Sequence, residues 1–251
     1  MAKSNVYLFA NWKMYLNSAE SEKLAKEVGK LGKKMSKKIK MTIFPSALAF
    51  GAVSKSLKNS VVAVGAQNVH QEDKGGYTGE VSAVMYKNAG AKFALVGHSE
   101  RRHLFHETNH DVKMKMDAVL SNKLIPVLCV GETQKERADA KEKEVVEIQL
   151  RSALDGLKWG KNPQLIVAYE PVWAIGTGNH CDPSQAQIMC ELVLKMATHL
   201  AKDVKIVVLY GGSVNSDNVA EFIKQPSISG ILVGGASAKL DSWSQIVHNA
   251  S

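Results

Sequence analysis

The chain has 251 residues, of which 45% are hydrophobic, 22% charged and 6% aromatic, a composition typical of a soluble globular protein and not of a disordered one. The formal net charge of +8 raises the question of nucleic-acid binding, but the densest run of lysines, within residues 30–40, contains no aromatic residue and no nucleic-acid motif. No apolar stretch approaches the roughly 18 residues of a membrane span, and none near the start resembles a secretory signal. We therefore expect a cytoplasmic protein that binds neither nucleic acid nor membrane.

The cysteines Cys129, Cys181 and Cys190 are odd in number and far apart, and none forms a Cys-x-x-Cys pair. This pattern predicts free thiols rather than a disulfide framework or a zinc site. No linker, low-complexity segment or shift in composition divides the chain. We therefore expect a single domain over residues 1–251.

Eight times along the chain, a short apolar run leads through a polar or glycine-containing junction into a stretch with helical periodicity. This alternation predicts parallel strands joined by crossover helices. The expected strands lie near Val6–Ala10, Lys40–Phe44, Val61–Ala66, Phe93–Val96, Ile125–Val130, Leu165–Glu170, Lys205–Tyr210 and Gly230–Val233.

Two helix starts are marked by capping residues. Asn17, with Glu20 three residues later, forms a capping-box pattern, and apolar residues recur at helical spacing over residues 24–35. Asp182 followed by Pro183 predicts a second helix start. Both helices would connect consecutive strands.

Eight strand-helix units fit either an open doubly wound sheet or a closed barrel, and their number alone does not decide between the two. Most of the strand-to-helix junctions, rather than one or two, carry polar residues that could take part in chemistry. A closed barrel brings all eight of these junctions together around one mouth. The distribution therefore favours an α/β fold of the (β/α)8 barrel type.

The first junction contains Asn11, Trp12 and Lys13. A lysine at the end of a barrel strand can hold its ammonium group over the mouth, where it would attract a phosphate and stabilise negative charge developing on an oxygen. A lone lysine is ordinarily a solvated surface residue, so this assignment depends on the other junctions.

The sixth junction, residues 168–178, reads Ala-Tyr-Glu-Pro-Val-Trp-Ala-Ile-Gly-Thr-Gly. Pro171 biases Glu170 toward an extended conformation, so the loop leaves the strand end abruptly and the carboxylate is expected at the rim of the barrel. A glutamate in that place can act as a base. The following segment is a loop punctuated by glycines with an apolar tip.

Three glycine-containing junctions are candidates for binding a phosphate group. Glycine lets backbone N–H groups approach phosphate oxygens, although tight turns alone explain many paired glycines. Two of the junctions follow the seventh and eighth strands, where barrels of this class commonly bind phosphate. The candidate residues are Gly176, Ser213, Gly234 and Gly235.

The fourth junction, residues 97–102, reads Gly-His-Ser-Glu-Arg-Arg. Together with the Asn-Trp-Lys triplet, residues 168–178 and the glycine pairs, it resembles the triosephosphate isomerase family, in the family's order from Asn11 to Ser237. The resemblance implies a single-domain (β/α)8 TIM barrel that interconverts dihydroxyacetone phosphate and D-glyceraldehyde 3-phosphate in glycolysis and gluconeogenesis. It implies no metal and no organic cofactor.

The resemblance also implies roles for individual residues. Glu170 would be the general base, and His98 a neutral imidazole that donates to the carbonyl oxygen of the substrate, kept neutral by a helix N-terminus beside it. Lys13 and Asn11 would bind the substrate. Glu100 would be a supporting charge that pairs with Lys13. The segment Cys-Val-Gly-Glu at residues 129–132 also matches the family and is expected to serve in packing.

Two loops carry further expectations from the resemblance. The long junction at residues 67–80 resembles the family's dimer loop and implies a homodimer in which Thr78 lies near Asn11 and Lys13 of the neighbouring subunit. Residues 171–178 would form a lid over the phosphate. The sequence after the lid, Asn-His-Cys at residues 179–181, departs from common forms of the family, which puts the kinetics of the lid in doubt.

Three alternative functions are weighed against this one. Another phosphosugar isomerase or an aldolase would need a Schiff-base lysine or metal ligands at the strand ends, whereas Lys13 beside a Glu/His pair favours enolisation. A barrel that had lost catalysis would lack Glu170, His98 or Lys13, and all three are present. A nucleic-acid binder driven by the +8 charge would show salt-dependent retention on DNA.

Overall fold

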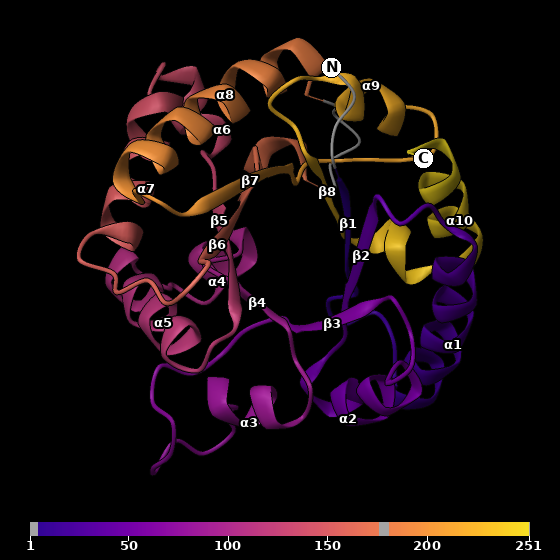
Figure 1. Cartoon of the computed structure of the whole chain (residues 1–251). Helices are drawn as coiled ribbons and strands as arrows, with labels where there is room; N and C mark the ends of the chain where they lie inside the picture. Colours follow the sequence, from indigo (N-terminus) through magenta and orange to yellow (C-terminus); the bar gives the residue numbers. More distant parts are fainter. Residues whose placement is uncertain (1–4, 176–180, 251) are drawn as a thin grey trace.

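The computed structural model describes residues 5–175 and 181–250. Eight parallel strands form a closed barrel in strict chain order, in which the first strand pairs with both the second and the last (Figure 1). The predicted (β/α)8 barrel is confirmed, and an open doubly wound sheet is excluded because the sheet closes on itself. The strands are β1 Val6–Asn11, β2 Ile39–Phe44, β3 Ala63–Ala66, β4 Phe93–Val96, β5 Ile125–Val130, β6 Gln164–Tyr169, β7 Lys205–Tyr210 and β8 Gly230–Val233.

The helices lie around the outside of the barrel (Figure 1). Two short 3-10 helices, η1 and η2, instead occupy the loops that follow β6 and β8. The elements are α1 Ser18–Lys34, α2 Ala47–Ser56, α3 Ala83–Asn88, α4 Ser99–Leu104, α5 Asn109–Ser121, α6 Gln134–Ala138, α7 Glu142–Leu154, η1 Val172–Ala174, α8 Pro183–Leu200, α9 Val219–Lys224, η2 Gly235–Ala238 and α10 Leu240–Asn249.

Most predicted strand boundaries agree with the structure to within one residue, and two of the differences have structural meaning. The third strand begins at Ala63 rather than Val61, because the N–H of Val62 donates to Ser60 Oγ and the side chain of Val61 is 71% exposed. The sixth strand ends at Tyr169, so Glu170 is the first residue of the loop. At both places the predicted strand extends past the residues that pair with a neighbouring strand, and pairing defines where a strand begins and ends.

The two predicted helix starts are confirmed. Asn17 Oδ1 accepts from the N–H of Glu20 at 2.9 Å, and Glu20 Oε2 accepts from the N–H of Asn17 at 2.9 Å, which completes a capping box at the start of α1. Asp182 caps α8, with Pro183 in its first turn. Each pattern is local, so the sequence contains all of the information needed to place it.

The strands bury both of their faces, because side chains alternate between the inside of the barrel and the helices outside. In β1, Phe9 belongs to the cluster that fills the barrel, while Leu8 and Ala10 belong to the cluster shared with the helices. The ring of Phe9 lies with its centroid 5.5 Å from that of Phe44 and 5.2 Å from that of Phe93. The barrel interior is therefore packed, and ligands can bind only at its ends.

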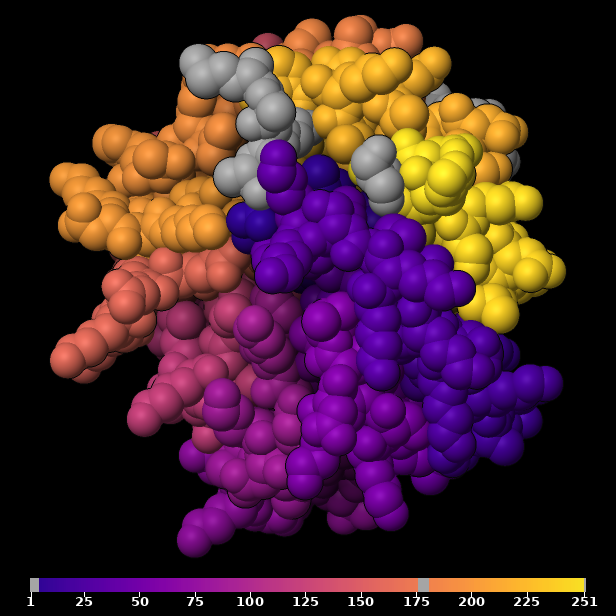
Figure 2. Space-filling view, turned by 45° about the vertical axis from the view of Figure 1, so that its right-hand side comes forward, coloured from indigo at the N-terminus to yellow at the C-terminus, as the bar shows by residue number. Residues whose placement is uncertain are grey.

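Closure of the barrel depends on a close approach of backbones. Gly230 of β8 is paired with Tyr7 of β1, and a Cβ atom at residue 230 would lie 2.0 Å from the carbonyl oxygen of Tyr7. Any side chain here would separate the first and last strands. The N-terminal and C-terminal parts of the chain consequently lie side by side on one face, with α1 packed against α10 (Figure 2).

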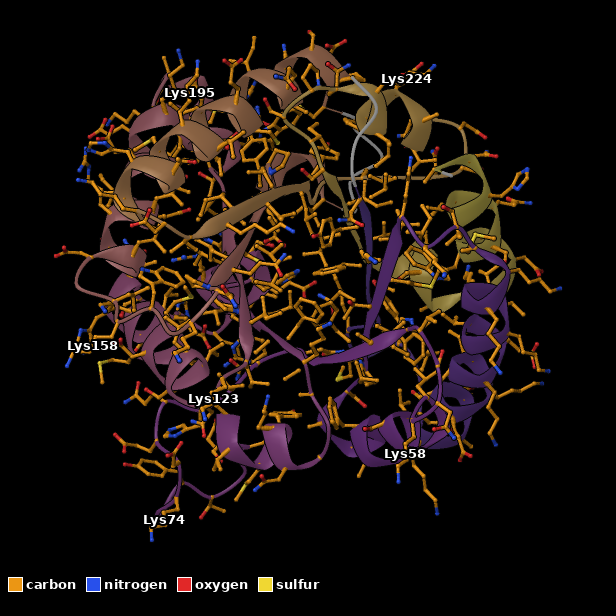
Figure 3. The ribbon with its side chains drawn as sticks, in the orientation of Figure 1. Lys58, Lys74, Lys123, Lys158, Lys195 and Lys224 are labelled. Carbon is orange, nitrogen blue, oxygen red and sulfur yellow. The ribbon has the colours of Figure 1, made fainter. Side chains whose placement is uncertain are left out.

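The positive charge is spread around the periphery of the molecule. Six exposed lysines from different parts of the chain, most of them in loops, point outward in several directions (Figure 3). In the parts of the chain that the structure describes, none of the helices is both long enough and apolar enough to cross a lipid bilayer. The lysines in question are Lys58, Lys74, Lys123, Lys158, Lys195 and Lys224.

Candidate active site

Glu170 is fixed at the point where β6 becomes a loop. Its N–H donates to the carbonyl oxygen of Val130 at 2.7 Å, and Pro171 follows it directly. On the neighbouring strand end, a Cβ at Gly131 would lie 1.8 Å from the carbonyl oxygen of Glu170, so only glycine fits there. Glu170 lies at the end of its strand and lines a cavity there, and it is only 2% exposed.

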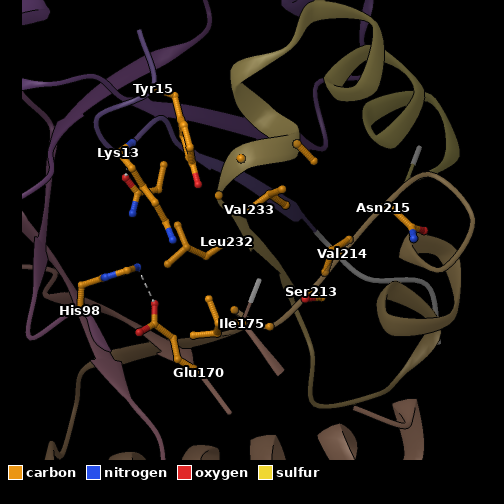
Figure 4. Close-up of a pocket in the computed structure, with 16 residues that line it drawn as sticks. Lys13, Tyr15, His98, Glu170, Ile175, Ser213, Val214, Asn215, Leu232 and Val233 are labelled. Carbon is orange, nitrogen blue, oxygen red and sulfur yellow. Dashed lines mark hydrogen bonds and ion pairs between the residues drawn. The ribbon is translucent and has the colours of Figure 1, made fainter. Parts of the chain in front are cut away.

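The carboxylate of Glu170 contacts the junction that follows β4. Glu170 Oε2 accepts from the N–H of Ser99 at 2.9 Å, and Glu170 Oε1 lies 3.3 Å from His98 Nε2 (Figure 4). The fourth and sixth junctions, which are far apart in the sequence, therefore meet at hydrogen-bond distance. A buried carboxylate and an imidazole in contact form a pair that can move protons.

His98 is oriented by the start of α4. It occupies the N-cap position, and its Nδ1 accepts from the N–H of Glu100 at 3.3 Å. Because an Nδ1 that accepts a hydrogen bond carries no proton, this contact assigns the proton of a neutral ring to Nε2. Nε2 is also the atom that faces Glu170 and the cavity, so the ring is oriented to donate there.

Lys13 is held in place by three contacts. Its backbone has φ +46°, which is uncommon for a residue with a side chain, and its N–H donates to Asn11 Oδ1 at 3.1 Å. Gln67 Nε2 donates to the carbonyl oxygens of both Lys13, at 2.9 Å, and Phe44, at 2.8 Å. Lys13 Nζ forms an ion pair with Glu100 Oε1 at 2.7 Å. The ammonium group is thereby held at the mouth of the barrel.

These side chains line one cavity of about 320 Å³. This is the size of a site for a small ligand. Figure 4 shows Lys13, His98 and Glu170 pointing into the cavity from one side, whereas the other side consists of the loops after β7 and β8. The lining residues are Asn11, Lys13, Tyr15, His98, Glu170, Ile175, Gly211, Gly212, Ser213, Val214, Asn215, Leu232, Val233, Gly234, Gly235 and Ala236.

Comparison with known proteins gives a consistent result over the whole barrel. The sequence model of the family described as triosephosphate isomerase matches residues 6–250. The chain belongs to the triosephosphate isomerase family. Relatives with that name include one from Dictyoglomus thermophilum, 41% identical over 96% of this chain and 97% of the relative, and one from Carboxydothermus hydrogenoformans, 40% identical over 97% and 98%. A relative of the same name from Chlamydia muridarum is 37% identical over 98% of this chain and 91% of its own length.

Two of the glycines expected to bind phosphate in this triosephosphate isomerase family member line the cavity. A Cβ at Gly234 would lie 3.0 Å from Lys13 Cε and 3.4 Å from Lys13 Nζ, so the loop after β8 lies directly against the lysine. Gly235 begins η2 beside it. Gly176, the third glycine, lies outside the residues that the structure describes.

Ser213 connects the loop after β7 to the first part of the segment expected to form the lid. Both its N–H, at 3.0 Å, and its Oγ, at 2.5 Å, donate to the carbonyl oxygen of Ala174 in η1. Ala174 is fully buried and Ile175 half-buried, so these two residues are not an exposed apolar tip. Ser213 lines the cavity, but in this arrangement its hydroxyl group is bonded to the lid segment.

The first residues of the lid are held by Glu132, which the sequence suggested only as a packing residue. The buried carboxylate of Glu132 accepts from Trp173 Nε1 at 2.8 Å and from the hydroxyl of Tyr169 at 3.1 Å. Burial, with the charge of Glu132 adding to it, raises the pKa of Tyr169, so this hydroxyl keeps the proton that it donates. An acidic residue two positions past a strand end was the only signal for this role in the sequence.

The remaining expectations concern loops at the edge of the site. Thr78 is exposed on the loop between β3 and α3 and does not line the cavity. Residues 179 and 180 are outside the described ranges, while Cys181 is buried and its pKa is raised by burial to about 11. Within those ranges, no three His, Cys, Asp or Glu side chains are grouped so that they could hold a metal ion.

Proposed function

We propose that this chain interconverts dihydroxyacetone phosphate and D-glyceraldehyde 3-phosphate, in glycolysis and gluconeogenesis. The observation that carries this proposal is the contact of 3.3 Å between His98 Nε2 and Glu170 Oε1 in a cavity of small-molecule size. Isomerisation of a triose phosphate needs a base beside the carbon that loses a proton and a donor beside the carbonyl oxygen. Family membership supports the same reaction.

The proposed reaction begins with proton transfer to Glu170. The carboxylate removes a proton from the carbon next to the substrate carbonyl, while His98 Nε2–H donates to the carbonyl oxygen, which becomes the oxygen of an enediol or enediolate. Lys13 and Asn11 stabilise the negative charge and position the substrate. Glu170 then returns the proton to the neighbouring carbon, while the hydroxyl proton on the carbon that was deprotonated moves by way of His98 Nε2 to the former carbonyl oxygen, so no atoms are gained or lost overall.

The phosphate group of the substrate would bind on the side of the cavity that is formed by the loops after β7 and β8, away from His98 and Glu170. The backbones at Gly234 and Gly235 line that side, and we assign Ser213 and Gly176 to the same task. An enediolate left in water can lose its phosphate. Closure of residues 171–178, of which 176–178 lie outside the described residues, would exclude water and enclose the phosphate.

Replacement of the base tests the reaction directly. Glu170→Gln keeps the size of the side chain but removes the proton acceptor, so kcat should fall by about 10² to 10⁴, or roughly 3–5 kcal/mol. Turnover of D-glyceraldehyde 3-phosphate, coupled to reduction of the dihydroxyacetone phosphate formed, measures the effect in protein made by a host without its own isomerase. Glu144→Gln, at an exposed residue of α7, is the control that should keep full activity. A folded Glu170→Gln protein with unaltered turnover would exclude Glu170 as the base.

We also propose that the chain forms a homodimer through residues 67–80. Next to Lys13, a second cavity of about 420 Å³ is surrounded by exposed apolar side chains, with Met14 95% exposed, Leu104 69% and Phe105 64%. The loop between β3 and α3 protrudes from the barrel, with Lys74 at its outer edge (Figures 1 and 3). We propose that this loop of one copy enters the second cavity of the other and brings Thr78 close to the lysine.

Sedimentation equilibrium tests the dimer. The wild-type chain should have twice the mass of one copy, and Met14→Arg should give monomers because a cation would be forced into the apolar contact. Val61→Arg, at an exposed site away from both cavities, is the matched control and should remain dimeric. A monomeric wild type at micromolar concentration would rule out the dimer.

We place the protein in the cytoplasm, together with its phosphorylated substrates. All three cysteines are free and buried, as is usual for proteins of reducing compartments. Fractionation of cells that express the protein, followed by the activity assay on each fraction, tests this location. Activity recovered mainly outside the cytoplasmic fraction would contradict it.

A further inference from the structure

Arg102 of α4 joins the ends of two strands next to the base. Its Nε donates to the carbonyl oxygen of Gly97 at 2.8 Å, its Nη1 to Asn109 Oδ1 at 2.9 Å, and its Nη2 to the carbonyl oxygen of Cys129 at 3.3 Å. Each nitrogen of the guanidinium group is therefore bonded to a different segment: the junction after β4, the start of α5, and β5. The planar fork of arginine is suited to bridging acceptors in such fixed positions.

The acceptors of these bonds are neighbours of the two reacting side chains. Gly97 directly precedes His98, and Cys129 is followed by Val130, whose carbonyl oxygen accepts from the N–H of Glu170 at 2.7 Å. A shift of either strand end would change the distance between His98 and Glu170. The rate of proton transfer depends steeply on such distances. The hydrogen bonds from Arg102 should therefore affect the rate of the reaction as well as the stability of the fold.

Arg102 also lies within electrostatic range of the carboxylate of Glu170. Both residues line a narrow space that is too small for a water molecule and is separate from the active-site cavity. A positive charge in a space without room for water is poorly screened, so its attraction for a neighbouring carboxylate is stronger than at the surface. The charged or titratable groups around Arg102 are Cys129 on β5, Glu170 after β6, Glu107 between α4 and α5, and His103 on its own helix.

We propose that Arg102 is a positioning residue for the isomerisation, which holds the ends of β4 and β5 in place and sets a fixed positive charge against the carboxylate of Glu170. This inference rests on the proposed role of Glu170 as the base. Burial lowers the pKa of the guanidinium, and the negative charges of Glu170 and Glu107 act against this effect, as expected for a buried cation with anionic neighbours. Arginine stays protonated in proteins, so the charge is permanent.

The test separates the charge from the hydrogen bonds by means of two variants. Arg102→Met removes both, so kcat should fall about tenfold or more, and the acid limb of the pH profile of kcat/KM should move to higher pH. The direction follows because a carboxylate that loses a nearby cation binds its proton at higher pH. Arg102→Lys keeps the positive charge but cannot form all three hydrogen bonds of the guanidinium group, so kcat should fall while the acid limb stays in place. The second ionisation of the substrate's phosphate also lies near pH 6, but it is the same for every variant.

Lys115→Met is the matched control for the Arg102 variants, and two outcomes would overturn the proposed role of Arg102. Lys115→Met removes a partly buried cation that is bonded to Glu107 and Asn68 and does not line the space beside Glu170, so it should leave the acid limb unchanged. An unchanged acid limb in a folded Arg102→Met protein would overturn the proposed charge effect. If that variant does not fold, Arg102→Lys decides, because wild-type kcat in that protein would overturn the positioning role. Loss of turnover in Glu170→Gln, measured in parallel, shows that such a failure concerns Arg102 alone and not the base.

Discussion

At the scale of single residues, the site is built from side chains whose freedom has been removed before a substrate arrives. Lys13 has an uncommon backbone conformation that Asn11 and Gln67 hold, and the ring of His98 is oriented by the N–H of Glu100. Groups fixed in this way need little reorganisation during the reaction, which is the main source of electrostatic catalysis. The free energy that fixes them comes from folding, so changes at neighbours that never touch the substrate should alter the rate.

The first prediction at this scale concerns the side of the cavity assigned to phosphate. Gly234→Asp would place a carboxylate against Lys13, where it repels the phosphate and competes with it for the ammonium group. We expect KM to rise roughly ten- to hundredfold, or about 1–3 kcal/mol, with a smaller loss in kcat. Steady-state kinetics with D-glyceraldehyde 3-phosphate measures both constants.

Gly234→Ala is the control for this prediction. Its Cβ would meet only the flexible end of Lys13, so the loop should keep its position and KM should change little. A KM equal to that of wild type in Gly234→Asp would mean that the phosphate binds elsewhere.

At the scale of elements, the proposed reacting groups lie at the ends of strands, where the chain passes into a loop or helix. The barrel strands carry almost no functional groups along their length, whereas the residues directly after β1, β4 and β6 contribute Lys13, His98 and Glu170. The strand ends are rigid because both of their faces are packed. Loops attached to rigid ends can vary in sequence while the reacting groups keep their spacing.

A prediction at this scale separates the stability of an element from the function of the site. Asn17→Ala removes the side-chain acceptor at the start of α1 and should lower the free energy of unfolding by about 1 kcal/mol, because the N–H of Glu20 loses its partner. Turnover should not change, since α1 lies outside the barrel, away from the cavity. Urea denaturation and the coupled assay measure the two effects.

The conservative variant Asn17→Ser serves as the control. Serine is an equally good capping residue, so most of the lost stability should return. A loss of turnover in Asn17→Ala at temperatures where the protein is folded would contradict the separation of α1 from the site.

At the scale of the whole molecule, burial raises the pKa of thiol and phenol groups that take no part in the proposed reaction. Burial raises the pKa of Cys181 from 9.0 to about 11 and that of Tyr86 from 10.0 to about 12, and it raises the pKa of Cys129 well above its ordinary value. In the unfolded chain these groups lose their protons at lower pH than in the folded chain. The folded barrel therefore becomes less stable in alkali.

The prediction for Cys181 follows from this linkage. Between pH 9 and 11 the unfolded chain has released the proton of the Cys181 thiol, while the folded chain still holds it. The contribution of the protonated thiol to the free energy of unfolding is therefore complete below pH 9 and is lost as pH rises to about 11. Two pH units correspond to at most about 3 kcal/mol. Urea denaturation over this range should show a smaller decline for Cys181→Ala than for wild type. The difference between the two proteins at pH 8 gives the packing cost alone, and parallel curves from pH 8 to 11 would disprove the effect.

Much of this protein could be predicted from its sequence because the relevant signals are local. Seven of the eight expected strands agree with the structure to within one residue at each end, because a buried parallel strand is a continuous apolar run. Both helix starts were marked by residues that bond within three positions of themselves. The distribution of polar residues over the junctions predicted closure into a barrel with its site at one end.

Only the tertiary structure decided what depends on atoms that are distant in sequence. The bond from Ser99 to Glu170 spans 71 residues and the pair of Lys13 with Glu100 spans 87, and no sequence pattern gives such distances. The sequence does not show that Glu170 is buried, because the segments that cover it lie far from it along the chain. The sequence alone determined which residues stand at the strand ends, because hydrophobic periodicity and capping act over a few residues. The closed barrel decided which of these residues meet and in what environment, because packing and electrostatics act through space.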